Sequence, residues 1–232
     1  MKLEILDAYS IRARLSASIL LISPILITLF FLFEESFTVL SSSVIIFVLL
    51  AFTNCLPIMQ RCIYKKRKER TNYAAKLLYV DDETINEVVK RSYYKKLSGI
   101  DESFCSFKNP NDSQEFKDAC ERAVLYLRNN TRDNHLIQEE NINYGFIRNL
   151  VSTKAAGIII SFACLLLSCV YLYINLNNCL AISDHIIMSC VVNALLLLFW
   201  LFFVKKDKLD IAGKEYAKAL IYSIDSIDLN KK

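Results

Sequence analysis

Two short clusters of basic residues carry the clearest chemical signal in the chain. In KRSYYKK, residues 90–96, two tyrosines stand among four cations. Aromatic rings flanked by positive charge stack on bases and hold phosphates without reading a base sequence. The second cluster, KKRKER, spans residues 65–70. We expect an anionic nucleotide or oligonucleotide ligand at these side chains: Lys65, Lys66, Arg67, Lys68, Arg70, Lys90, Arg91, Tyr93, Tyr94, Lys95 and Lys96.

Each cluster also has a simpler interpretation. Residues 65–70 closely follow an apolar run, and a basic flank of this kind orients a membrane helix. Such a flank also attracts anionic membrane lipid, at about 1 kcal/mol per basic residue. Residues 90–96 can instead be a solvated helix face with one tyrosine buried. The choice depends on the elements that carry the clusters.

Four uncharged runs make up much of the remaining sequence, at residues 15–33, 39–59, 155–174 and 186–204. Each is 19 to 21 residues long. A helix needs about 20 residues to cross a hydrocarbon core. The sequence therefore predicts an all-α membrane protein with four transmembrane helices arranged as two hairpins.

Positive charge is confined to three parts of the chain. All 28 lysines and arginines lie outside residues 15–60 and 155–204, so neither predicted outer turn contains one. Lysine and arginine in short loops favour the cytoplasmic side. We therefore expect both termini in the cytoplasm. The predicted parts are an N-terminal segment with the first hairpin (1–60), a cytoplasmic helical module (61–154), a second hairpin (155–204) and a cytoplasmic C-terminal helix (205–232).

The predicted module contains two amphipathic patterns. Asp81 and Asp82 are predicted to cap a helix that Gly99 ends. The apolar face of this helix holds Ile85, Val88, Val89, Tyr93 and Leu97. The sequence DSQE, residues 112–115, predicts a capping box. The helix after it is expected to bury Phe116, Ala119, Cys120, Val124 and Leu127. Gly145 is expected to interrupt the helix that leads into the third apolar run.

The C-terminal segment predicts a third amphipathic helix. Its apolar face holds Leu209, Ala212, Tyr216, Leu220, Ile224 and Ile227. That face needs a partner, which is either the central module or a neighbouring subunit. A module of this size buries a limited core, so we expect a homo-oligomer, with a tetramer favoured.

Polar residues inside the apolar runs predict a pore. Asn54 lies in the second run and Asn193 midway along the fourth. An amide in hydrocarbon needs a partner, so each forms an interhelical hydrogen bond or lines an aqueous path. Glu34 and Glu35 occupy the first outer turn, and in an oligomer they would form an acidic ring that favours cations. A stripe of small residues on the third run favours helix packing: Gly157, Ser161, Cys164 and Ser168.

Motifs for catalysis and metal binding are missing from the sequence. The eight cysteines never occur as CxxC, and the four glycines are isolated. His135 and His185 fall on opposite sides of the membrane by the predicted topology, which excludes a site built from both. His135 could act as a base beside Asp133, Glu139 or Glu140, and a solvated surface histidine is the alternative. We therefore expect no enzyme, no cofactor and no metal site, and structural roles for the cysteines.

The layout of two apolar runs, a module at 61–154, two more runs and a cytoplasmic tail, with ENINYGFIRNL before the third run, resembles the four-transmembrane effectors of bacterial antiphage defence operons. These include effectors associated with nucleotidyltransferases that make nucleotide signals, and the channel effector of the Hailong system. The resemblance implies a bacterial inner-membrane channel whose opening disrupts the membrane potential. It also implies gating by a signal from a partner nucleotidyltransferase.

Two functions follow from these observations. The first is an oligomeric, ligand-gated channel, because four spans enclose an aqueous path only when they are repeated around an axis. The second is a membrane-anchored sensor or adaptor that docks a soluble partner without conducting ions. Polar residues inside the runs and the acidic outer turn favour the channel.

Overall fold

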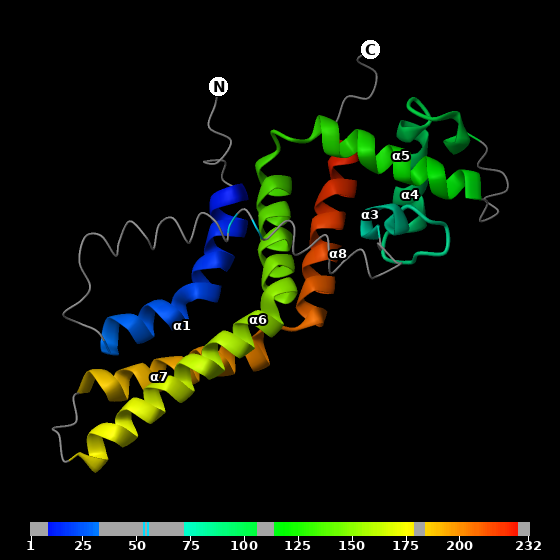
Figure 1. Cartoon of the computed structure of the whole chain (residues 1–232). Coiled ribbons are helices and arrows are strands. Elements are labelled where there is room, and N and C mark those ends of the chain that lie inside the picture. Colours follow the sequence, from blue (N-terminus) through cyan, green and yellow to red (C-terminus); the bar gives the residue numbers. More distant parts are fainter. Residues whose placement is uncertain are drawn as a thin grey trace. The chain divides into compact units, whose positions relative to one another are not determined.

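The computed structural model describes residues 9–32, 53, 55, 72–105, 114–178 and 184–226. Within these residues every regular element is a helix (Figure 1). This observation confirms the predicted all-α class. Most of the second apolar run lies outside the described residues, and so do Asp112 and Ile227.

Among the described residues, three helical stretches are long and apolar enough to cross a membrane. They are Ile11–Leu32, His135–Asn177 and Asp184–Phe203. They contain nearly all of the first run, the whole of the third and nearly all of the fourth. By length and composition, these helices are those of a multi-pass membrane protein.

The chain folds into two compact units. The first, here called the membrane unit, comprises Met1–Lys68 and Gly145–Leu209. The second, here called the helical unit, comprises Glu69–Tyr144 and Asp210–Lys232. The chain passes between the units inside helix α6 (His135–Asn177) and again inside helix α8 (Lys206–Tyr222). These two of the three connections are therefore helical, and the third, between Lys68 and Glu69, lies outside the described residues.

The membrane unit is built around helices α1, α6 and α7. A π-helical turn, Ser10–Leu15, leads into α1 (Ser16–Leu32), and α7 (Asp184–Leu198) continues into a π-helical turn, Phe199–Phe203. Trp200 is fully buried in this unit and packs with Ala17, Leu21, Leu150 and Val204.

Proline is accommodated inside α1 by a neighbouring serine. Pro24 has no N–H, so the carbonyl of Leu20 loses the donor that it would have in a regular helix. The hydroxyl of Ser23 donates to that carbonyl at 3.0 Å. This hydrogen bond supplies the carbonyl of Leu20 with a donor, and the helix continues through the proline.

Two glycines in α6 permit close approach of other side chains. A Cβ at Gly157 would overlap the indole of Trp200, and a Cβ at Gly145 would overlap the ring of Tyr9. Helix α6 runs through Gly145 without a break. The expected interruption at Gly145 is therefore wrong, because its lack of a side chain makes room for Tyr9 and does not end the helix.

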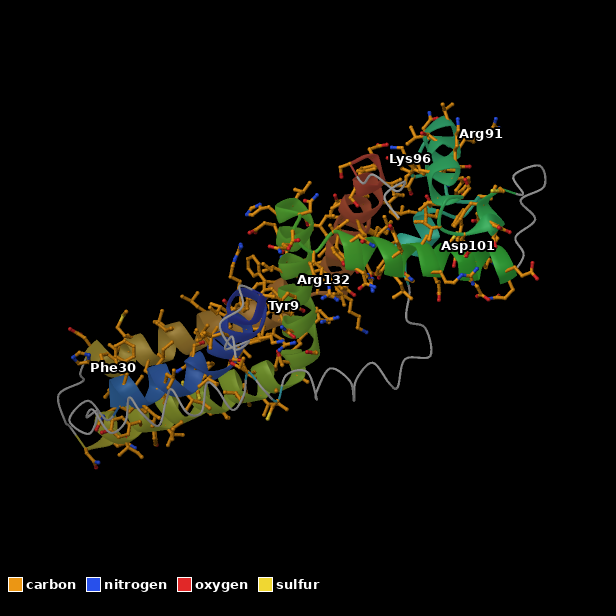
Figure 2. All side chains as sticks on the ribbon, turned by 90° about the horizontal axis from the view of Figure 1, so that it is seen from above. Tyr9, Phe30, Arg91, Lys96, Asp101 and Arg132 are labelled. Carbon is orange, nitrogen blue, oxygen red and sulfur yellow. The ribbon has the colours of Figure 1, made fainter. Side chains whose placement is uncertain are left out.

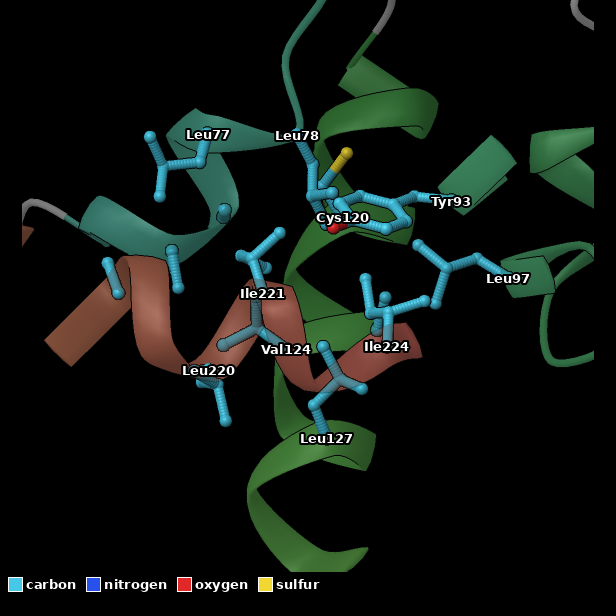
Figure 3. Packing of buried hydrophobic residues seen from close by; sticks show 14 of the residues in the cluster. Leu77, Leu78, Tyr93, Leu97, Cys120, Val124, Leu127, Leu220, Ile221 and Ile224 are labelled. Carbon is cyan, nitrogen blue, oxygen red and sulfur yellow. The ribbon is translucent and has the colours of Figure 1, made fainter. Parts of the chain in front are cut away.

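The helical unit has its own apolar core (Figure 3). Its helices are α3 (Tyr73–Leu77), α4 (Glu87–Leu97), α5 (Gln114–Asn130), the first part of α6 and most of α8. Two short 3-10 turns, Glu102–Phe104 and Ser223–Asp225, complete it. The largest buried side chains of this core are Leu78, Tyr93, Tyr94, Leu97, Val124, Leu127, Leu220, Ile221 and Ile224.

Helix α4 begins later than the sequence pattern suggests. Asn86 caps it, because its Oδ1 accepts from the N–H of Val88 at 2.9 Å. Asp82 accepts from the N–H of Thr84 in the preceding loop at 2.9 Å. The predicted caps Asp81 and Asp82 are therefore wrong. Ile85 precedes the helix, so using it to set the helix phase misplaced Val88 and Val89, which are 75% and 37% exposed.

Helices α5 and α8 match the sequence pattern more closely. All five residues predicted for the buried face of α5 are buried. Leu220 and Ile224 of the C-terminal segment lie in the core of the helical unit together with Ala217 and Ile221. The partner of the C-terminal helix in this chain is therefore the central module.

Candidate functional site

Lys90, the first residue of the predicted ligand cluster, lies inside the helical unit. It is only 4% exposed, and its Nζ donates to the carbonyl of Tyr79 at 2.6 Å and to that of Asp82. Burial lowers the pKa of its ammonium, and nearby Asp82 and Asp81 partly oppose that effect. Lys90 therefore holds the loop before α4 in place through two backbone carbonyls.

The two tyrosines of the cluster are core residues. Tyr93 and Tyr94 are each 2% exposed. The Tyr94 hydroxyl donates to the carbonyl of Leu78, and its ring stacks on Phe104 with 5.8 Å between the ring centroids. Desolvation raises the pKa of Tyr93 to about 12, with a further contribution from its hydrogen bond to Asp225. Neither ring is placed to stack on a base at the surface.

The remaining cations of this cluster lie on the outer face of α4. Arg91, labelled in Figure 2, is exposed. It forms an ion pair with Glu87 one turn earlier. Lys95 is also exposed. Lys96 is half-buried, and its Nζ donates to Asp225 at 2.9 Å. Of the four cations in residues 90–96, Arg91, Lys95 and Lys96 are therefore the ones that solvent reaches.

Asp225 joins helix α4 to the end of the C-terminal segment. Its carboxylate accepts from Lys96 Nζ at 2.9 Å and from the Tyr93 hydroxyl at 3.0 Å. The hydrogen bond from Lys96, followed by that from Tyr93, lowers the pKa of Asp225. Asp225 was missed at the sequence level because it lies 129 residues from Lys96, and no local spacing connects them.

Inside the membrane unit, Asn193 is the centre of a hydrogen-bond network. The residue is fully buried on α7. Its Nδ2 donates to Thr28 Oγ1 of α1 at 2.8 Å and to Ser189 Oγ at 3.4 Å. Ser189 Oγ lies 2.8 Å from Ser168 Oγ of α6. Three apolar helices are thus joined through one amide.

The donor and the acceptor of each hydrogen bond in this network can be assigned from the two hydroxyl groups at its ends, those of Thr28 and Ser168. The Thr28 hydroxyl donates to the carbonyl of Pro24 at 2.8 Å, so it accepts from Asn193. The Ser168 hydroxyl donates to the carbonyl of Cys164 at 3.0 Å, so Ser189 donates to Ser168 and accepts from Asn193. Both amide hydrogens of Asn193 therefore start a chain that ends on a backbone carbonyl, one on α1 and one on α6.

The amide oxygen of Asn193 takes no part in these hydrogen-bond chains. Among the described residues it meets no hydrogen-bond donor, although it is buried. Leaving a buried carbonyl oxygen without a hydrogen bond costs about 1–3 kcal/mol of stability, so a hydrogen-bond donor at this oxygen would be stabilising. Thr28 and Ser189 were missed at the sequence level. Ser189 precedes Asn193 by one helical turn on the same face, a spacing that could have identified it.

Several predicted site residues lie outside the described residues, and their predicted roles stay predictions. They are Glu34, Glu35, Asn54, Lys65, Lys66, Arg67, Lys68 and Arg70. His135 opens α6 with its side chain 87% exposed, 3.7 Å from Glu139. No group of three metal-ligating side chains comes together in the part of the chain that the structure describes.

No family model matches the chain, and no curated protein or solved structure is significantly similar to it.

Proposed function

We propose that this chain is the subunit of an oligomeric, ligand-gated channel of the bacterial inner membrane. In this proposal it acts as an effector of antiphage defence, and its opening disrupts the membrane potential. The observation that carries the proposal is the Asn193 network, with an amide oxygen that lacks a donor among the described residues. A polar group in a membrane helix is costly, so it is expected to meet either a hydrogen-bond partner or water.

Opening, in this proposal, brings water to the Asn193 amide. Rearrangement of α1, α6 and α7 would break the bonds from Nδ2 to Thr28 and Ser189 and expose the amide to an aqueous path. Water would then replace both acceptors and also donate to Oδ1. The resting state keeps the amide buried, which fits a channel that stays closed until a signal arrives.

The helical unit is the proposed receiver of that signal. Arg91, Lys95 and Lys96 offer positive charge on one helix, and residues 65–70 add more in the sequence. The ligand class is an anionic nucleotide or oligonucleotide made by a partner nucleotidyltransferase. The chain leaves the helical unit inside α6 and returns to it inside α8. A shift in either helix would therefore reach the membrane unit through continuous hydrogen-bonded backbone.

Full burial of Asn193 favours a second function. If the network only fastens α1, α6 and α7 together, the chain is a membrane-anchored sensor or adaptor. Its helical unit would then dock a soluble partner without ion flow. In that case the amide contributes to helix association and nothing passes along it.

Single-channel recording of the Asn193→Leu variant distinguishes these functions. Leucine keeps the approximate size and removes the amide, so a hydrated constriction should dry and the current through each open channel should fall. Val191→Leu, at an exposed position of the same helix, is the matched control and should conduct like the wild type. Unchanged unitary current in Asn193→Leu, with fewer assembled channels, would assign Asn193 to fastening.

A further inference from the structure

Helices α6 and α7 meet through a pair of serines. Ser168 and Ser189 are both fully buried, and their hydroxyl oxygens are 2.8 Å apart. Serine side chains are short, so a direct bond between them requires a close approach of the two helix backbones. Figure 1 shows α7 beside the last part of α6. Ser168 is near the end of α6 and Ser189 near the start of α7, so the two helices run antiparallel.

The residue after each serine is a cysteine. One step along a helix turns the side chain by about 100°. In two antiparallel right-handed helices that face each other, this step turns both side chains toward the same flank of the pair. Cys169 and Cys190 are therefore neighbours on that flank, and their thiols are close enough to interact electrostatically.

These two thiols differ in surroundings from those of Cys164 and Cys120. Cys169 is exposed and Cys190 is half-buried. Cys164, one turn or so before Cys169, contacts Thr28 instead, and Cys120 is fully buried in the core of the helical unit. Val170 and Val191, which follow the two cysteines, are both exposed. An apolar reagent dissolved in the bilayer can therefore reach this pair.

We propose that Cys169 and Cys190 form a dithiol modification site, which an organic hydroperoxide dissolved in the membrane converts to an intrachain disulfide. The first thiol attacks the peroxide, the O–O bond breaks, and a sulfenic acid and an alcohol form. The second thiol attacks the sulfenic sulfur, the S–S bond forms, and water leaves. The two electrons lost by the sulfurs reduce the peroxide. A dithiol reductant reverses the change.

The disulfide would cross-link α6 to α7 directly beside the Ser168–Ser189 bond. It would fix the spacing of the two helices whether or not the chain conducts ions. This inference is therefore independent of the proposed channel, and its test needs no current measurement.

The test uses the purified full-length protein in lipid vesicles, with cumene hydroperoxide as the probe. Cys179 is replaced by serine in all samples, because it lies in the connection between α6 and α7 and could link two chains. After oxidation the protein is denatured, free thiols are alkylated and peptides are mapped by mass spectrometry. We expect a linked peptide pair that contains Cys169 and Cys190, and two fewer alkylated thiols per chain.

Matched variants make the assignment specific. Cys164→Ser should still form the linked pair, because Cys164 is on the same helix but outside the site. Cys169→Ser and Cys190→Ser should each lose it. Full alkylation of both cysteines after oxidation of the parent protein would overturn the proposal. A link from Cys169 of one chain to Cys169 of another would also overturn it, since that product requires the thiols to face a second subunit.

Discussion

At the residue scale, the basic cluster at residues 90–96 separates into two kinds of side chain. Lys90, Tyr93 and Tyr94 face the interior, whereas Arg91 and Lys95 face solvent. The helical spacing of the cluster predicts that it has two faces. The sequence placed Tyr93 on the apolar face but did not indicate that Lys90 is buried, because a lysine is a poor candidate for a core position until its carbonyl partners are known.

Replacement of Lys90 by methionine should destabilise the helical unit. Methionine fills a similar space but leaves the carbonyls of Tyr79 and Asp82 without the ammonium. We expect a loss of about 1–3 kcal/mol in the free energy of unfolding. Thermal unfolding followed by circular dichroism measures it, with the exposed Lys95→Met as control. Equal stability of the two variants would show that Lys90 does not hold the loop.

The Asp225 carboxylate predicts a pH dependence. Its pKa is lowered in the folded protein, so its contribution to stability is full above the ordinary aspartate pKa and is lost as the pH falls through the folded value. The melting temperature of the wild type should therefore fall on acidification more than that of Asp225→Asn. Melts of both proteins between neutral and acidic pH test this expectation. Parallel pH profiles would mean that the bonds from Lys96 and Tyr93 contribute nothing measurable.

At the scale of elements, hydrophobic periodicity predicted the helices well where the pattern began inside the helix. Every residue predicted for the core face of α5 is buried, because Phe116 and the following apolar positions all lie within the helix. The phase of α4 was wrong because Ile85 belongs to the loop. Gly145 was misjudged because helix propensity is a local property, whereas the approach of Tyr9 is a tertiary contact.

A single methyl group at Gly157 should disturb the packing of α6 against Trp200. The Cβ of Gly157→Ala would overlap the indole, so the helices must separate or the ring must move. We expect a cost of about 1–3 kcal/mol. Thermal unfolding in detergent measures the loss of stability in Gly157→Ala. The control is Ala155→Val, at an exposed position two residues earlier. The double variant Gly157→Ala with Trp200→Leu should recover part of the loss, and failure to do so would count against this contact.

At the scale of the whole molecule, charge distribution and apolar length predicted a multi-pass helical protein. The three candidate spans in the described part of the chain are compatible with that class, and the predicted number of four is not tested by them. The Asn193 network could be anticipated only in part. One amide in an apolar run signals a hydrogen bond, but the identity of Thr28 as its partner depends on which helices meet. The two residues are 165 positions apart, and no sequence pattern links them.

The proposed topology has a direct test. Reporters fused after Lys232 or inserted near Asn109 should read cytoplasmic, and a membrane-impermeant thiol label should reach Cys179 from outside intact cells. The reason is the absence of lysine and arginine from both predicted outer turns. A periplasmic signal from the reporter near Asn109 would reverse the orientation and place the basic clusters on the wrong side for a cytoplasmic ligand.

The central claim is that copies of this chain assemble into a ligand-gated channel. Purified wild-type protein should be sized in detergent and then recorded in planar bilayers under an ion gradient. Recordings before and after addition of a short single-stranded oligonucleotide report whether an anionic ligand changes the open fraction. We predict an oligomer with discrete openings whose frequency changes with the oligonucleotide. A folded protein that is strictly monomeric and leaves the bilayer silent in both conditions would contradict the claim.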